Sequence, residues 1–145
     1  MKLLEILKGI EEIDIKGESE REVLGIAYDS RSVKPGDMFV AVVGFKTDGH
    51  MYLESAISNG AEVICVEENA QLPEIPAHVT VVSCKNTRQL MALASCNFYS
   101  HPSRDFKLVG VTGTKGKTTT TYMIKTILEK AGKKVGLIGT IANMI

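Results

Sequence analysis

Short apolar runs separated by polar turns fill the first hundred residues of the chain. Runs rich in β-branched residues predict strands, and apolar residues that recur every three to four positions predict helices. The pattern predicts strands at residues 23–28, 38–42, 63–66 and 79–82, and helices at residues 3–10, 52–59 and 87–99. Short strands and helices mixed in this way are typical of an α/β fold. We therefore expect a small α/β domain in this part of the chain.

The pattern changes after a polar stretch with a proline at residues 100–105. The apolar run at residues 108–112 predicts a strand, the apolar stripe within 122–130 predicts a helix, and residues 135–138 predict another strand. We place the boundary in the polar stretch, with one domain at 1–104 and the beginning of another at 105–145. Two strands and one helix cannot cover both faces of a parallel sheet. We therefore expect the second domain to be incomplete and to expose much of its apolar surface.

Composition excludes several classes of function. The 145 residues have a formal net charge of zero, which gives no electrostatic footprint for nucleic acid. No apolar run approaches the roughly 18 residues needed to span a bilayer, and the first residues do not resemble a secretory signal, so we expect a cytoplasmic protein with no membrane partner. The cysteines Cys65, Cys84 and Cys96 are odd in number and lie in or beside apolar runs, which predicts reduced core thiols rather than a metal site.

The clearest candidate site is a glycine-rich segment, Gly-Thr-Lys-Gly-Lys-Thr-Thr-Thr-Thr, at residues 113–121. Glycines between a strand and a helix let successive backbone amides face one phosphate group. We expect Lys117 to reach the β- and γ-phosphates of ATP and to be the catalytic lysine, and Thr118 to bind Mg²⁺. The expected ATP phosphate-binding residues are Gly113, Thr114, Lys115, Gly116, Lys117, Thr118 and Thr119. The spacing departs from the usual P-loop, whose leading glycine would fall at Val111.

Together these segments resemble the Mur ligase family of peptidoglycan synthesis, almost from end to end. The resemblance rests on Tyr-Asp-Ser-Arg-Ser-Val-Lys-Pro-Gly-Asp-Met-Phe-Val-Ala at residues 28–41, on Gly44 and on Asp-Gly-His at 48–50. The phosphate loop at 112–120 is similar to the family's own variant, with Lys115 where many members have asparagine. Residues 98–103 and 137–141 look most like the member that adds the third amino acid of the peptide.

The resemblance implies an ATP-dependent amide ligase that uses ATP and Mg²⁺. Its partners would be UDP-N-acetylmuramoyl-L-alanyl-D-glutamate and an amino acid, meso-diaminopimelate or L-lysine, joined through an acyl phosphate by a monomeric enzyme. The family's acidic Mg²⁺ ligand, its carbamylated lysine and its C-terminal amino-acid domain have no counterpart in this sequence. We therefore expect the chain to be inactive as a ligase on its own.

In the family, the first domain holds the uridine diphosphate end of the substrate, which assigns Ser30, Phe45, Lys46 and Thr47 to that role. Other interpretations remain open from the residues themselves. The segment Asp-Ser-Arg at 29–31 also suits a turn that closes on its own backbone, and Lys46 also suits a solvated surface charge. The segment Asp-Gly-His at 48–50 suits either a structural turn or a ligand site, while Arg31 and Asp37 suit structural partners better than ligand contacts.

Two other functions also fit the sequence. One is a segment of the related ligase that adds D-alanyl-D-alanine, which shares the Asp-Ser-Arg and Asp-Gly-His segments. The other is a stand-alone nucleotide-binding module, which would bind a UDP-sugar without hydrolysing ATP.

Overall fold

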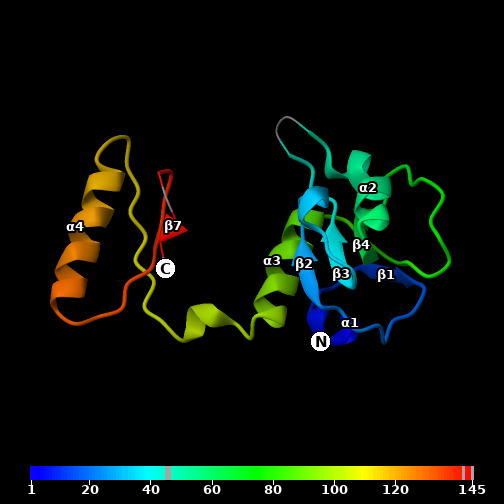
Figure 1. Cartoon of the computed structure of the whole chain (residues 1–145), viewed down its shortest axis with the longest axis horizontal. Coiled ribbons are helices and arrows are strands. Elements are labelled where there is room, and N and C mark those ends of the chain that lie inside the picture. Colours follow the sequence, from blue (N-terminus) through cyan, green and yellow to red (C-terminus); the bar gives the residue numbers. More distant parts are fainter. Residues whose placement is uncertain (45–46, 142, 145) are drawn as a thin grey trace. The chain divides into compact units, whose positions relative to one another are not determined.

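The computed structural model of the protein describes residues 1–44, 47–141 and 143–144. The chain forms two compact units, Met1–Asp105 and Phe106–Ile145, which are described one at a time (Figure 1). The predicted α/β class is confirmed, because strands and helices are mixed along the chain and four of the five strands of the main sheet run in parallel.

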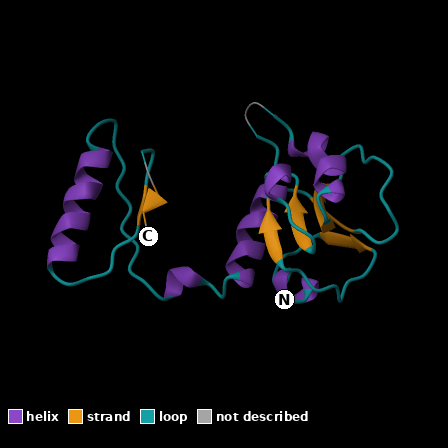
Figure 2. Cartoon of the chain, viewed as in Figure 1, coloured by secondary structure: helices purple, strands orange, loops and turns teal. Residues whose placement is uncertain are grey.

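A five-stranded sheet forms the centre of the first unit (Figure 2). Its strands are β1 (Ile13–Lys16), β2 (Gly25–Ala27), β3 (Asp37–Val40), β4 (Ala61–Glu67) and β5 (Thr80–Cys84), in the spatial order β1-β5-β4-β3-β2. Strands β2 to β5 are parallel, and β1 pairs antiparallel with β5. The carboxyl ends of the parallel strands therefore share one edge of the sheet, which is where α/β proteins usually bind ligands.

Helices cover both faces of this sheet. Helices α1 (Leu3–Ile6) and α3 (Thr87–Phe98) pack on one face with Met38 and Val40 of β3, and α2 (Leu53–Ser58) packs on the other with Phe39. Successive side chains of a strand point to opposite faces, so β3 contributes to two cores and every residue in it is buried. The centre of the sheet is therefore buried on both faces.

Two elements at the beginning of the chain are shorter than the sequence pattern predicts. The helix predicted at residues 3–10 ends at Ile6, followed by a turn in which Gly9 has a φ of 77°. The strand predicted at 23–28 is reduced to Gly25–Ala27, because Val23 exchanges backbone hydrogen bonds with Met1 instead of extending β2. Strand β1 was missed, although the alternation Ile-Asp-Ile-Lys at residues 13–16 is its signal.

The cysteines are reduced, as predicted. Cys65 and Cys84 are buried in the sheet, Cys96 is half-buried in α3, and all three are free thiols. Burial raises the pKa of the Cys65 and Cys84 thiols, so neither is a reactive thiolate near neutral pH.

The second unit contains α4 (Lys117–Lys130) and a short antiparallel pair, β6 (Leu137–Ile138) with β7 (Asn143–Met144). The strand predicted at residues 108–112 is wrong: these residues form no strand, and Leu108 and Val109 are exposed. A strand needs a neighbour for its backbone N–H and C=O groups, and no described strand pairs with this segment. The predicted exposure of apolar surface is confirmed, because Leu137 is the one buried hydrophobic residue among the described residues of the unit.

None of the described helices is long and apolar enough to cross a membrane.

Candidate nucleotide and substrate sites

The glycine-rich segment forms an open loop in front of α4. Gly113 and Gly116 have φ values of 149° and 80°, which glycine adopts without strain, and Gly116 directly precedes the first helical residue, Lys117. In the described part of the chain, none of the backbone amides from Thr114 to Thr119 donates to a backbone carbonyl. A row of free amides at the N-terminus of a 14-residue helix suits an anion such as a phosphate group.

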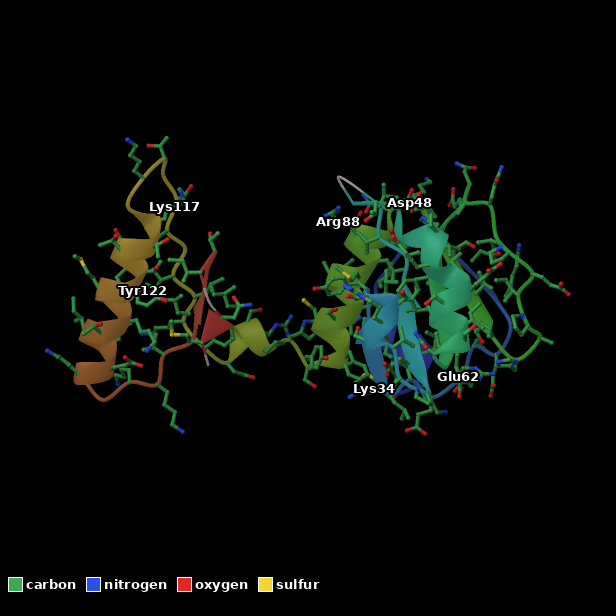
Figure 3. All side chains as sticks on the ribbon, turned by 45° about the horizontal axis from the view of Figure 1, so that its top comes forward. Lys34, Asp48, Glu62, Arg88, Lys117 and Tyr122 are labelled. Atoms are coloured by element: carbon green, nitrogen blue, oxygen red, sulfur yellow. The ribbon has the colours of Figure 1, made fainter. Side chains whose placement is uncertain are left out.

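Lys117 lies against this loop (Figure 3). Its Nζ donates a hydrogen bond of 2.6 Å to the carbonyl oxygen of Gly113, four residues before it. The ammonium group is exposed, so a bound phosphate can compete for it. The predicted glycines, with Thr114 and Lys115, therefore lie in the loop, and Lys117, Thr118 and Thr119 form the first turn of α4 beside it.

For Mg²⁺, the loop offers the hydroxyl group of Thr118, which is half-buried in the first turn of α4. No group of three histidine, cysteine or acidic side chains is placed to hold a metal ion among the described residues. Mg²⁺ usually keeps several waters and shares phosphate oxygens with a nucleotide. One hydroxyl group beside a phosphate-binding loop fits that mode of Mg²⁺ binding. The described residues do not offer a site made only of protein side chains.

Ser30 follows β2 and begins the 3-10 helix η1 (Ser30–Ser32). Asp29 caps this turn by accepting from the Arg31 N–H at 3.0 Å, and the Ser32 hydroxyl donates to the Asp29 carbonyl at 2.8 Å. The Ser30 carbonyl accepts from Asn59 Nδ2 at 2.9 Å. The segment is thus the self-closing turn considered above. Ser30 is 7% exposed, and no hydrogen bond described for the protein uses its hydroxyl.

The Asp29 carboxylate should titrate at unusually low pH. Side-chain and backbone hydrogen bonds from Arg31 lower the pKa of Asp29 from 3.8 to about 2. A lowered carboxyl pKa means that the turn gains stability above the ordinary pKa and loses it as the pH falls toward 2. A carboxyl ¹³C NMR titration should give a midpoint near 2, and R31A should move it back toward 3.8. An unchanged midpoint in R31A would contradict this assignment.

The loop after β3 contains the other predicted contacts with uridine diphosphate. Phe45 and Lys46 lie outside the described residues. Thr47 is exposed, and its carbonyl accepts from the Gly44 N–H at 2.9 Å, while Val43 and Asp48 form an antiparallel bridge. Because β2 and β3 are parallel neighbours, the segment with Ser30 and the loop with Thr47 leave the sheet at the same edge.

Asp48, Gly49 and His50 form a structural turn at this edge. The Asp48 carboxylate accepts from the backbone N–H of His50 at 2.9 Å and caps the 3-10 helix η2 (Gly49–Tyr52), which leads into α2. This hydrogen bond, together with one between the His50 ring and the same carboxylate, lowers the pKa of Asp48. In Figure 3, Asp48 and Arg88 lie at one end of the first unit, and Lys34 and Glu62 lie at the other.

A cavity of about 560 Å³ opens at the carboxyl ends of β3, β4 and β5. Its charged or titratable lining residues are Asp48, His50, Glu67, Glu68 and Lys85, and Ser30 is not among its lining residues. Three carboxylates against one lysine would repel a diphosphate. A uridine diphosphate contacting Ser30 would therefore lie outside this cavity. The backbone N–H of Glu67 donates to His50 Nε2 at 3.0 Å, and Arg88 Nη2 donates to the Val43 carbonyl at 2.7 Å. The sequence pattern gave no signal for either contact, because both depend on the tertiary fold.

Family models match both parts of the chain. The model described as "Mur ligase family, catalytic domain" matches residues 22–99, more than half of the chain. The chain belongs to the Mur ligase family. The model of the Mur ligase middle domain matches residues 111–145, which include the phosphate loop and α4.

Curated Mur ligases match this chain over its whole length. The UDP-N-acetylmuramoyl-L-alanyl-D-glutamate–2,6-diaminopimelate ligase of Clostridium tetani is 48% identical over 145 residues, which are 100% of this chain and 30% of that protein. The ligase of the same name from Alkaliphilus metalliredigens is 49% identical over 145 residues, or 29% of its length. The chain thus spans about three tenths of the length of the relatives it matches.

Solved structures of Mur ligases share the fold. A UDP-N-acetylmuramoyl-L-alanyl-D-glutamate–2,6-diaminopimelate ligase superimposes with a TM-score of 0.68 and 24% identity, covering 99% of this chain and 28% of the other. MurF ligase from Thermotoga maritima, solved in complex with ADP, has a TM-score of 0.54 and 26% identity, covering 78% of this chain and 25% of the other.

Proposed function

We propose that this chain is the substrate- and ATP-binding segment of a cytoplasmic ligase that adds meso-diaminopimelate to UDP-N-acetylmuramoyl-L-alanyl-D-glutamate. The match of the whole chain, at 48% identity, to a ligase with that name carries the proposal. The phosphate loop of the second unit and the free Ser30 hydroxyl of the first unit support it. L-Lysine remains the other amino acid that the resemblance allows.

The loop suits the first step of such a reaction. A substrate carboxylate attacks the γ-phosphorus of ATP, the bond from phosphorus to the bridging oxygen breaks, and ADP leaves while an acyl phosphate forms. The amine of the incoming amino acid then attacks the acyl carbon and expels inorganic phosphate, leaving an amide. Both reactants of the first step are anions and repel each other. Positive charge beside the phosphate oxygens must offset this repulsion. Lys117 and the free amides of residues 114–119 would supply it, and Mg²⁺ beside Thr118 would add to it when bound.

The first unit would hold the other end of the substrate. The hydroxyl of Ser30 and the exposed Thr47 are the proposed contacts with uridine diphosphate, together with Phe45 and Lys46 of the same loop. Ser30 follows β2 and Thr47 follows β3, and these strands are parallel neighbours. One ligand at this edge of the sheet can therefore contact both residues.

A chimaera tests the substrate- and ATP-binding roles that the proposal gives to this chain. Residues 1–145 replace the matching segment of the Clostridium tetani ligase in one protein, and the matching segment of the Thermotoga maritima MurF ligase in another. We expect the first chimaera to release phosphate only when ATP, the UDP-linked dipeptide and diaminopimelate are all present. Turnover by the second chimaera alone would instead favour the ligase that adds D-alanyl-D-alanine.

The 145-residue chain provides the complementary measurement. If neither chimaera turns over, but the melting temperature of the chain rises with UDP and not with ATP, the stand-alone nucleotide-binding module is correct. Folding of each chimaera is checked by its thermal transition, so that an unfolded protein is not counted as an inactive one.

A further inference from the structure

His50 uses both nitrogens of its ring. Its side chain is 9% exposed, its Nδ1 lies 2.6 Å from Asp48 Oδ1, and its Nε2 accepts a hydrogen bond of 3.0 Å from the backbone N–H of Glu67. Because Nε2 accepts, it carries no proton, so the proton of a neutral imidazole is on Nδ1 and is donated to Asp48. The imidazole therefore connects the turn after the β3 loop to the end of β4.

Two further contacts hold the base of the same loop. The Gly49 N–H donates to the Val42 carbonyl at 3.0 Å, and a Cβ atom on Gly49 would lie 2.6 Å from the Val42 nitrogen. From α3, Arg88 Nη2 donates to the Val43 carbonyl at 2.7 Å. The base of the loop, which we define as Val43, Gly44, Thr47 and Asp48, is thus held by Val42 just after β3, by β4 and by α3.

The imidazole is linked to Thr47 through Asp48. Thr47 is bonded covalently to Asp48, and Asp48 bridges back to Val43 and accepts from His50. The Glu67 amide that His50 engages belongs to the last residue of β4, a central strand of the sheet. Without the ring, the turn would keep its backbone hydrogen bonds but lose the side-chain bond to Asp48 and the link to that strand.

We propose that His50 is a positioning residue for uridine diphosphate binding, acting by fixing the base of the β3 loop against β4. This inference rests on the proposed function, because it takes uridine diphosphate as the ligand of that loop. His50 itself does not contact the ligand. Instead, His50 fixes the position from which Thr47 contacts uridine diphosphate.

The test uses His50→Phe, His50→Gln and the 145-residue chain. Phenylalanine keeps the bulk of the ring but removes both hydrogen bonds, whereas the glutamine amide oxygen can still accept from the Glu67 N–H. Binding of UDP is measured by calorimetry, and amide hydrogen exchange of Glu67 and Gly44 is measured by NMR. We expect H50F to weaken UDP binding about tenfold and to speed Glu67 exchange at least about tenfold, as for a lost hydrogen bond of a buried group. H50Q should restore most of the UDP affinity and most of the protection of the Glu67 amide.

The matched control is His78→Phe, the same substitution at an exposed histidine, which should change neither measurement. Equal UDP affinity in H50F and wild type, or unchanged Glu67 exchange, would overturn the inference. If H50F does not fold, His50→Ala takes its place, with the same expected losses of UDP affinity and Glu67 protection. If the wild-type chain does not bind UDP at all, the proposed function fails, while the exchange data still show whether the imidazole holds the loop.

Discussion

Replacing Lys117 with alanine should reduce the turnover of the Clostridium tetani chimaera by about 10³-fold or more, the loss typical of removing one essential charge-stabilising donor. The reason is electrostatic. A carboxylate must approach the γ-phosphate of ATP, and the ammonium group of Lys117 lies on the loop that would hold that phosphate. The measurement is the steady-state rate of phosphate release at saturating substrates.

Lys107→Ala is the matched control for this prediction. Lys107 is an exposed lysine of the same unit, outside the glycine-rich segment, and no hydrogen bond described for the protein involves its ammonium group. We expect K107A to keep most of the activity. Since Lys117 is exposed and contacts a loop carbonyl, K117A should change the free energy of unfolding by no more than about 0.5 kcal/mol. Turnover of K117A within tenfold of the parent would contradict the catalytic role proposed for Lys117.

Phe39→Ala should have the largest effect on stability. Phe39 is 1% exposed in the middle of β3 and belongs to the core between the sheet and α2. Truncating a buried phenylalanine removes its apolar contacts and leaves a cavity, which costs about 3–5 kcal/mol. The measurement is urea denaturation of the 145-residue chain, followed by far-ultraviolet circular dichroism.

Tyr28→Ala is the comparison for Phe39→Ala. It removes an aromatic side chain from the same unit, directly after β2, but Tyr28 is 70% exposed. The free energy of unfolding of Y28A should therefore stay within about 0.5 kcal/mol of the parent value. A loss below about 1 kcal/mol for F39A would mean that β3 is not packed on both faces as described. Because β3 leads directly into the loop with Thr47, F39A should also weaken binding of UDP.

Local signals in the sequence predicted much of the fold. The helix at 87–99 was predicted within one residue of α3, because its apolar stripe is long. In the structure, the Asn86 side chain also caps the first turn of this helix. Strands β3 and β4 were predicted from continuous apolar runs, which is typical of strands buried on both faces. The strand at 108–112 was predicted from the same kind of run and is absent, because an apolar run cannot supply its own pairing partner.

The phosphate loop was also recognisable from sequence, because its chemistry depends on glycines, a lysine and hydroxyl groups in consecutive positions. Their order alone places backbone amides and an ammonium group together before a helix. The role of Asp48, Gly49 and His50 was different. The sequence left a ligand site and a structural turn equally open, since the partner of His50 is the amide of Glu67, 17 residues away.

By itself, the sequence determined the α/β class, the glycine-rich segment with Lys117 before a helix, and the resemblance to Mur ligases that the family models bear out. These features depend on residue type and on spacing over a few positions. Only the tertiary structure decided that the Ser30 hydroxyl is left free by its own turn, that the acidic cavity does not include Ser30, and that His50 and Arg88 hold the β3 loop from two other elements. Those properties depend on which strands become neighbours, and strand order is set by the packing of the whole sheet rather than by any one segment.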